Sequence, residues 1–200
     1  MPRMNGPGER PLRADALRNA ERLVLAAREA FAEDGPEVSL EEIARRAGVG
    51  VATLYRRFPS KDDLVRGVLL WRYEERVAPV LETALVEEDP WRGVVSSLEA
   101  ALGMACEEQC TFLAAKNMSN LAAGIQERYF ADFTKIVARG QAAGVVRDDL
   151  TPEDLPPITY MLLGALRFVR TSEWDWRRYL GLLLDGLRPE GATPLPEPRR

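Results

Sequence analysis

Apolar residues recur every three or four positions along most of the chain, which is the period of an amphipathic helix. No segment shows the period-two alternation of a half-buried strand, and we find no internal repeat. The first predicted helix runs from about residue 16 to residue 33 and ends at Gly35. Its apolar stripe consists of Leu23, Ala27, Ala30 and Phe31. The pattern therefore predicts an all-α protein.

Two short helices are predicted next, close together in the sequence. Ser39 is the expected N-cap of the first, and Glu42 would complete a capping box with it. A turn at Gly48-Val49-Gly50 leads to the second short helix, over residues 51–58. Two short helices joined by a glycine-bearing turn have the spacing of a helix-turn-helix, although most such turns in all-helical proteins are packing elements.

Longer helices fill the rest of the chain. The first is capped by Ser60 and Asp63 and runs to about residue 75, and its side chains Leu64 and Val68 should cover the helix-turn-helix together with Leu23 and Phe31. Pro79 then interrupts or kinks the chain. Further helices are predicted over about residues 90–106, 117–143, 152–170 and 174–187. In total the pattern predicts about nine helices.

Composition excludes several classes of protein. Hydrophobic residues make up 46% and charged residues 29% of the chain, as in ordinary soluble domains. No apolar run approaches the roughly 18 residues that span a bilayer. The N-terminus has no secretory signal, so we expect a cytoplasmic protein without a membrane partner. The sequence has no histidine, which excludes histidine-dependent catalytic triads and most catalytic zinc sites, and we expect no cofactor.

The two cysteines, Cys106 and Cys110, are four positions apart on a predicted helix. They could act as a redox sensor, or as metal ligands together with Glu107 or Glu108. Burial as small apolar side chains is the favoured explanation.

The net charge of −4 does not by itself suggest a nucleic-acid partner. Residues 1–66 contain 12 Lys and Arg and 11 Asp and Glu, a net charge of +1, and the remaining 15 and 20 give −5. DNA binding therefore requires the basic groups to be focused on one surface. Hydroxyl and cationic donors are indeed concentrated at Thr53, Tyr55, Arg56, Arg57 and Lys61. Alternatively, these side chains form only a solvated basic edge. Asp62 and Asp63 partly neutralise its positive charge, which favours this alternative.

The stretch AREAFAEDGPEVSLEEIARRAGVGVATLYRRFPSKDDLVRGVL resembles the signature of the tetracycline-repressor (TetR) family of transcriptional regulators. It covers about a quarter of the chain, and its segment GVGVATLYRRFPSKDDL is the most specific part. The resemblance implies an N-terminal three-helix DNA-binding domain followed by a helical domain for ligand binding and dimerisation. We accordingly expect a disordered arm over residues 1–15, a helix-turn-helix domain over 16–75, a sensing and dimerisation domain over 76–188, and a disordered tail over 189–200.

The resemblance also implies roles for individual residues. Thr53 and Tyr55 would contact the DNA backbone, Lys61 would hold a phosphate, and Arg57 would lie near backbone or base. Val51, Ala52 and Arg56 would lie near base edges. Valine and alanine can contact thymine methyl groups but cannot form bidentate hydrogen bonds, so Arg56 would read a guanine or bind a phosphate. The acids Glu41 and Glu42 stand where some relatives have a basic group, which argues against base reading from the first short helix.

For the rest of the chain the resemblance implies only an architecture. The last two helices would form a dimer interface, and they are rich enough in apolar residues for that role, although ordinary core packing also explains them. These residues are Ile158, Met161, Leu162, Ala165, Phe168, Val169, Leu180, Leu183, Leu184 and Leu187. A small-molecule effector would bind among the central helices, where the same side chains could instead be core. Its candidate contacts are Trp91, Met104, Phe112, Asn117, Met118, Tyr129 and Phe133.

The predicted function is therefore that of a homodimeric repressor, which binds a pseudo-palindromic operator in double-stranded DNA and is released by an unknown effector. Two other classes remain open from the residues alone. A helical enzyme is one, although no nucleophile–base pair or phosphate loop appears in the sequence. A helical adaptor that binds a protein partner is the other.

Overall fold

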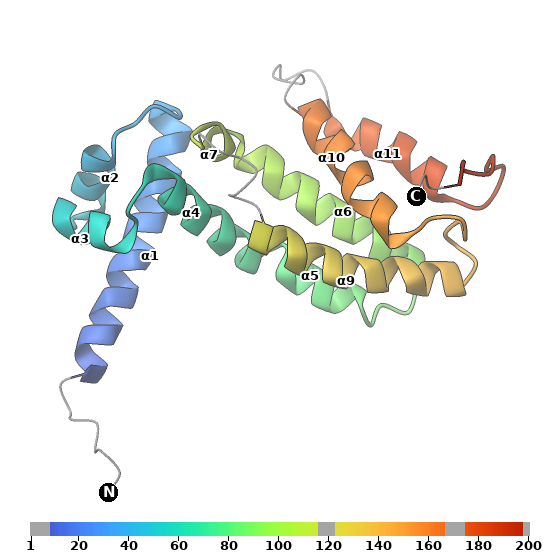
Figure 1. The fold of residues 1–200 in the computed structure, drawn as a ribbon, viewed down its shortest axis with the longest axis horizontal. Helices are drawn as coiled ribbons and strands as arrows, with labels where there is room; N and C mark the ends of the chain where they lie inside the picture. Colours follow the sequence, from blue (N-terminus) through green and yellow to red (C-terminus); the bar gives the residue numbers. More distant parts are fainter. Residues whose placement is uncertain (1–8, 116–122, 167–174, 198–200) are drawn as a thin grey trace, which may run out of the picture. The chain divides into compact units, whose positions relative to one another are not determined.

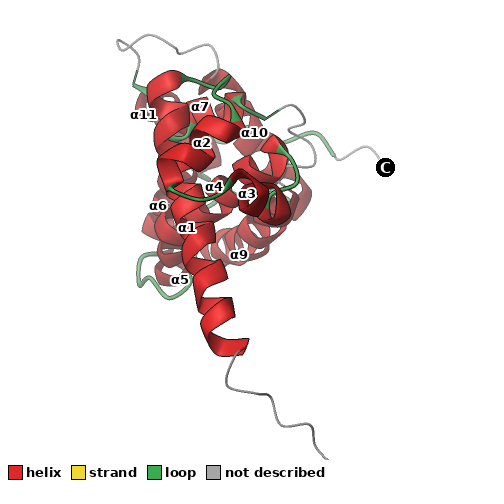
Figure 2. Ribbon diagram, turned by 90° about the vertical axis from the view of Figure 1, so that its left-hand side faces the viewer, coloured by secondary structure: helices red, strands yellow, loops and turns green. Residues whose placement is uncertain are grey.

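The computed structural model describes residues 9–115, 123–166 and 175–197, and every regular element in these ranges is helical (Figures 1 and 2). The prediction of an all-α protein is confirmed. In chain order the helices are α1 (Glu9–Asp34), α2 (Leu40–Ala47), α3 (Val51–Arg57), α4 (Lys61–Arg76), α5 (Ala78–Ala84), α6 (Pro90–Glu107), α7 (Gln109–Leu113), α9 (Ala123–Ala142), the 3-10 turn η1 (Pro152–Asp154), α10 (Leu155–Leu166) and α11 (Trp176–Leu187).

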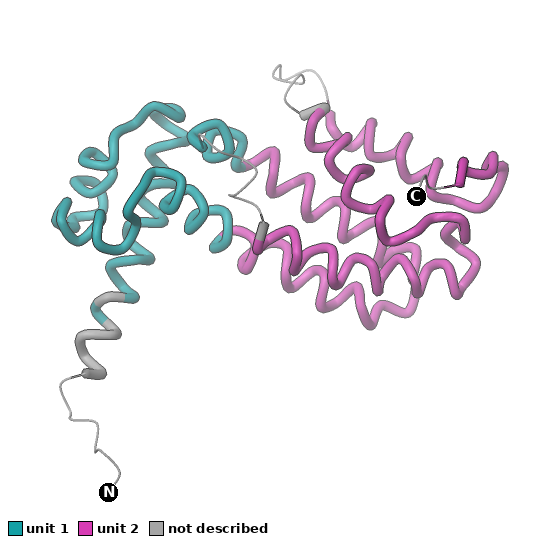
Figure 3. Tube along the Cα trace, viewed as in Figure 1, with its two compact units in different colours: residues 1–71, 108–122 teal, residues 72–107, 123–200 magenta. Residues whose placement is uncertain are grey.

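The chain divides into two compact units (Figure 3). Unit 1 comprises residues 1–71 and 108–122, and unit 2 comprises residues 72–107 and 123–200. In unit 1, α2 lies against α1 and beside α3 (Figure 1). The side chains expected to cover the helix-turn-helix are fully buried, which confirms that prediction: Leu23, Phe31, Leu64 and Val68.

The ends of α2 explain why so short a helix forms. Ser39 Oγ accepts a hydrogen bond from the N–H of Glu42 at 3.2 Å, as predicted. The carboxylate of Glu42 turns to Arg45 and Arg46 instead of completing the capping box. At the other end Gly48 has a φ of 61°, a left-handed conformation that suits glycine. A Cβ there would lie 2.7 Å from Nη2 of Arg22, the end of a flexible side chain that can move aside, so the backbone conformation rather than lack of space requires glycine.

Unit 2 is built around α6, which contacts α5, α9, α10 and α11. Its core contains Leu81 from α5, Val94, Leu98 and Leu102 from α6, and Phe133 and Ile136 from α9, all buried. Glycine allows two close approaches in this unit, one between α5 and α6 and one between α9 and the loop that follows it. A Cβ on Gly93 would lie 3.0 Å from the carbonyl oxygen of Ala84, and one on Gly140 would lie 2.6 Å from Val146.

Two prolines stand in the first turns of helices. Pro79 interrupts the helical run as predicted: α4 ends at Arg76, and Pro79 falls in the first turn of the next helix, α5, where a helix needs no N–H donor. Helix α1 begins at Glu9 rather than near residue 16, so the expected disordered arm is partly helical. Pro11 again falls in the first turn, and the Leu, Arg and Ala residues that follow are good helix formers. The predicted helix ends near residues 117, 170 and 174 lie outside the described residues.

The C-terminal segment also differs from the expected disorder. The backbone of residues 189–197 forms no long helix, yet it is tied to the loop after α9. Arg147 Nη2 donates to the carbonyl of Thr193 at 2.6 Å, and the N–H of Leu195 donates to Asp149 Oδ2 at 2.8 Å. Prolines prevent helix formation there but leave an extended backbone that side chains can hold. The final residues, 198–200, lie outside the described residues.

Candidate DNA-binding surface

Helix α3 separates its side chains cleanly between core and solvent. Leu54 is fully buried, whereas Val51 and Tyr55 are 40% and 42% exposed. Ala52, Arg56 and Arg57 are also exposed, and Thr53 is half-buried. The N-cap is Gly50, whose extended backbone starts the helix without a side-chain cap. The residues predicted to contact DNA on this helix thus share the part of it that faces solvent.

Tyr55 is linked to helix α2 through its hydroxyl group. The hydroxyl donates a hydrogen bond to Glu41 Oε1 at 3.0 Å, between two exposed side chains. This bond to a carboxylate, together with the negative charge itself, raises the pKa of Tyr55. The sequence prediction gave Tyr55 a DNA contact but no protein partner. A tyrosine and a glutamate 14 positions apart carry no periodic signal that could have paired them.

Lys61 has a structural partner as well. Its Nζ donates to the carbonyl oxygen of Pro36 at 2.6 Å and lies 5.8 Å from the centre of the Phe31 ring. The ammonium group therefore holds the loop between α1 and α2. An ammonium carries three donors, so this bond leaves capacity for a phosphate.

The basic side chains of α2 are largely neutralised within unit 1. Arg45 binds both carboxylate oxygens of Glu42, at 2.6 and 2.8 Å. Arg46 contacts the same carboxylate at 3.0 Å, Glu33 at 2.9 Å, and Asp34. Hydrogen bonds from the two guanidinium groups lower the pKa of Glu42 from 4.5 to about 2. Arg46 thus fastens α2 to the end of α1, and carboxylates within unit 1 offset the charges of both arginines.

The arginines of α3 are more available. Arg57 lies over the ring of Phe58, with its guanidinium carbon 5.6 Å from the ring centre. Arg56 is exposed, and no carboxylate in the described part of the chain pairs with it. Because guanidinium groups bind guanine edges and phosphates, Arg56 is the best-placed cation on this surface.

Comparison with known proteins identifies the family. The family model for bacterial regulatory proteins of the tetR family matches residues 23–68. An HTH-type transcriptional regulator of Staphylococcus aureus (strain bovine RF122 / ET3-1) is 43% identical over 54 residues, which make up 26% of this chain and 29% of that protein. The crystal structure of the TetR transcription regulatory protein from Mycobacterium vanbaalenii is 30% identical, with a TM-score of 0.61, over 89% of this chain and 99% of that one. The chain belongs to the TetR family.

A second TetR-family structure, from Streptomyces coelicolor, is 26% identical with a TM-score of 0.57 over 86% of this chain and 99% of that one. The protein is therefore a helix-turn-helix transcriptional regulator that binds DNA, and it is not an enzyme. The expected three-helix DNA-binding domain followed by a helical domain is confirmed. The alignment with the curated Staphylococcus relative spans less than a third of that protein's length.

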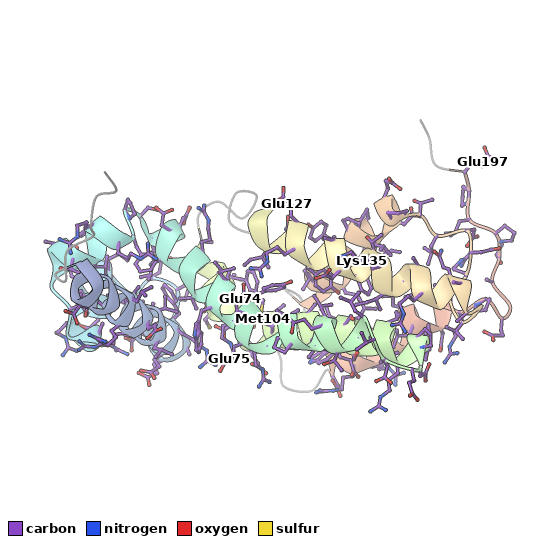
Figure 4. All side chains as sticks on the ribbon, turned by 90° about the horizontal axis from the view of Figure 1, so that it is seen from below. Glu74, Glu75, Met104, Glu127, Lys135 and Glu197 are labelled. Atoms are coloured by element: carbon purple, nitrogen blue, oxygen red, sulfur yellow. The ribbon has the colours of Figure 1, made fainter. Side chains whose placement is uncertain are left out.

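Two of the residues predicted for an effector site lie together in unit 2 of this TetR-family regulator. The rings of Tyr129 and Phe133 are stacked with centroids 5.3 Å apart, and both are buried. The hydroxyl of Tyr129 donates to the carbonyl of Ser97 at 3.4 Å. Burial raises the pKa of Tyr129 well above its usual range. Met104, labelled in Figure 4, is also buried and lies on α6, two turns beyond Ser97.

The other predicted effector contacts do not join this group. Trp91 stands in the first turn of α6, about 20 Å along the helix from Met104, and the guanidinium carbon of Arg188 lies 3.8 Å from the centre of its ring. Phe112 is on α7 and belongs to unit 1. Asn117 and Met118 lie outside the described residues. Periodicity shows which residues face inward on one helix, but not which helices share a core.

The predicted dimer residues divide between core and surface. Leu162, Leu180 and Leu187 are buried within unit 2, and Ile158, Leu183 and Leu184 are half-buried. Met161 is 65% exposed. The sequence prediction missed two neighbours on the same helices, Tyr160 at 41% and Leu182 at 68% exposed. The side chains of Ala165, Phe168 and Val169 lie outside the described residues.

Cys106 and Cys110 are free thiols, both half-buried. Burial raises the pKa of Cys106, which makes its reactive thiolate less abundant. Within the described ranges, no three Cys, Asp or Glu side chains are grouped to hold a metal ion. Over the same ranges, no helix combines the length and the apolar character that a membrane span requires.

Proposed function

We propose that the protein is a ligand-responsive repressor, which binds a pseudo-palindromic operator as a homodimer and leaves it when a small molecule binds. The observation that carries this proposal is the exposed face of α3. Val51, Ala52, Tyr55, Arg56 and Arg57 face solvent while Leu54 anchors the helix in the core. A recognition helix needs this division, because its outer face must enter the major groove while the inner face holds it in place.

The proposed DNA contacts fall into two groups: those that position α3 on the phosphate backbone and those that recognise bases. Thr53, Tyr55 and Lys61 would bind phosphates, which fixes the orientation of α3 without selecting a sequence. Arg56 would read a guanine, with Val51 and Ala52 against thymine methyl groups. Arg57, next to Phe58, would contact the backbone at the end of the helix. In this proposal the DNA-binding domain spans residues 16–75 and the sensing and dimerisation domain residues 76–188.

Dimerisation would use α10 and α11. Exposed apolar side chains on both helices, Tyr160, Met161 and Leu182, are costly to leave in water and favour burial against a second copy. A two-fold axis there would present two recognition helices to half-sites about one helical turn of DNA apart. This geometry is the reason for expecting a pseudo-palindromic operator.

The effector would bind in unit 2, next to the stacked and buried rings of Tyr129 and Phe133, with buried Met104 on helix α6 as a further candidate contact. An aromatic wall and one polar hydroxyl are typical of sites for small apolar ligands. Linkage requires the effector to prefer the state of the dimer that does not fit the operator. The ligand would then release the DNA by changing the spacing of the two recognition helices.

The first test is to enrich operators from a pool of random duplexes with the full-length protein and to measure their affinities by fluorescence anisotropy. We expect one palindromic consensus, bound at least about a thousandfold more tightly than a mixed-sequence duplex at physiological salt. The variant Arg92→Ala, which removes an exposed arginine from α6, is the control and should bind as the wild type does. Binding that is independent of sequence would overturn the proposal of a specific repressor.

A further inference from the structure

Glu41 stands out among the acidic residues around the recognition helix. It is exposed in the first turn of α2, and α2 lies beside α3 (Figure 1). Its neighbour Glu42 is neutralised by Arg45 and Arg46, and Asp63 lies 3.7 Å from Arg66. The carboxylate of Glu41, by contrast, accepts from a neutral group, the hydroxyl of Tyr55, and no Lys or Arg of the described ranges pairs with it.

This hydrogen bond conflicts with the expected role of Tyr55 on DNA. A phenol hydroxyl has one proton to donate. The carboxylate of Glu41, at 3.0 Å, already accepts it, and a DNA phosphate would be a second anionic acceptor for the same proton. The carboxylate would also face the phosphate as a like charge, which is unfavourable at short range even in water.

We propose that Glu41 is an acidic restraint on DNA binding: it holds the hydroxyl of Tyr55 and repels the DNA backbone, so that Tyr55 binds a phosphate only when Glu41 releases it. The inference rests on the proposed function, and it makes Glu41 a determinant of specificity. Contact with phosphates dominates non-specific binding. A residue that weakens this contact lowers the affinity for arbitrary sequences, so that binding depends more on the base contacts of Arg56.

The experiment compares Glu41→Gln with Glu29→Gln in the full-length protein. Both substitutions remove one exposed negative charge from unit 1, but Glu29 lies on α1 and has no tyrosine partner in the described ranges. The probe is a labelled duplex of mixed sequence, measured by anisotropy at about 50 and 200 mM salt. We expect Glu41→Gln to bind about three- to fivefold more tightly at the lower salt, and Glu29→Gln to differ little from wild type.

Tyr55→Phe completes a double-mutant cycle. In the wild-type background the hydroxyl is held by Glu41, so its removal should change affinity less than about twofold. In the Glu41→Gln background a neutral amide holds the hydroxyl less strongly, and its removal should cost about threefold or more. If the effects of Glu41→Gln and Tyr55→Phe on the free energy of binding are additive, the proposal is overturned, because Glu41 would then act only as a distant charge.

Other outcomes separate this inference from the proposed function. If the wild type binds the duplex and Glu41→Gln behaves like Glu29→Gln, the restraint is wrong and the proposed function stands. If Glu41→Gln binds the enriched operator less tightly, Glu41 reads a base amino group such as cytosine N4, which also overturns the restraint. A wild-type protein that binds no duplex at low salt would overturn both.

Discussion

Arg28 and Glu108, 80 positions apart in the sequence, form an ion pair within unit 1, with Nε of the arginine 2.7 Å from Oε1 of the glutamate. Only 2% of the Glu108 side chain is exposed. Its second oxygen accepts from Thr111 Oγ1 at 2.9 Å. A buried carboxylate is costly unless it is paired and hydrogen-bonded, so these two contacts fasten the start of α7 to α1.

We predict that Arg28→Met destabilises the protein by about 1–3 kcal/mol. The substitution keeps most of the aliphatic side chain but removes the charge that faces a buried carboxylate. This expected loss of stability is at the lower end of the range for buried ion pairs, because the side chain of Arg28 is 37% exposed. Urea denaturation followed by circular dichroism measures the change in the free energy of unfolding.

Arg18→Met provides the matched control for that substitution. Arg18 also lies on α1 and pairs with an acid, Asp15, but both side chains are more than 60% exposed, at 64% and 62%. Exposed ion pairs contribute little, so the control should change stability by less than about 0.5 kcal/mol. Equal effects of the two substitutions would contradict the structural role of the Arg28–Glu108 pair.

The pair also illustrates what the sequence could not predict. Apolar spacing predicted the helices and the buried side chains Leu23, Phe31, Leu64 and Val68, because each signal lies within one helix. Capping by Ser39 was equally local. Arg28–Glu108 and Tyr55–Glu41 join positions far apart in the chain, and polar residues show no preference in a sequence for one such partner over another.

The candidate DNA-binding surface was more predictable than the body of the protein. The motif around Tyr55 and Lys61 falls on the consecutive helices α3 and α4, so its resemblance to a known family determines the geometry. In unit 2, the expected effector contacts Trp91 and Met104 proved to lie near opposite ends of the same helix. A list of inward-facing residues does not determine which of them meet, because that depends on how several helices pack.

The attachment of the C-terminal segment should depend on pH. Hydrogen bonds from Arg147, at 2.6 and 2.8 Å, and from the N–H of Leu195 hold the pKa of Asp149 well below its usual range. A carboxylate with a depressed pKa contributes stability above the pKa it has in the unfolded chain, near 4, and this stability is lost as the pH falls further. We predict that the amide protons of residues 189–197 are protected at pH 7, relative to their intrinsic exchange rates at that pH, and that this protection is lost progressively below about pH 4.

Asp149→Asn should abolish that protection at pH 7, because a neutral amide binds the guanidinium group weakly. Asp148→Asn is the control: Asp148 is adjacent and exposed, and it accepts no hydrogen bond in the described contacts. Fast exchange of residues 189–197 in the wild type at neutral pH would contradict the attachment. Equal protection in both variants would show that Arg147 holds the segment without Asp149.

We next predict that Met161→Glu and Leu182→Glu each convert the proposed dimer to monomers. The two side chains are 65% and 68% exposed in one copy, so a carboxylate there should leave the monomer folded. In a two-fold interface, the substitution would bury two charges without partners, which is strongly unfavourable. Sedimentation velocity measures the oligomeric state, and circular dichroism checks the helix content.

Val86→Glu is the control for the dimer, since Val86 is an equally apolar and even more exposed residue, at 77%, that follows α5. It should leave the dimer intact. Monomers in the wild type, or dissociation by Val86→Glu alone, would contradict the assignment of α10 and α11. Loss of helix content in Met161→Glu would make Leu182→Glu the deciding variant.

The last prediction separates reading from positioning on α3. Arg56→Ala should reduce the preference for the enriched operator over a mixed-sequence duplex by about five- to a hundredfold, because a bidentate contact to guanine contributes about 1–3 kcal/mol of discrimination. Arg57→Ala should weaken binding to both duplexes by similar factors and make the dependence on salt less steep, as the loss of a phosphate contact does. Both side chains are exposed at the end of the same helix, so each variant serves as the control for the other. Equal losses on both duplexes for Arg56→Ala would assign Arg56 to the phosphate backbone, and the operator would then have to be selected by apolar contacts from Val51 and Ala52 or by the shape of the DNA.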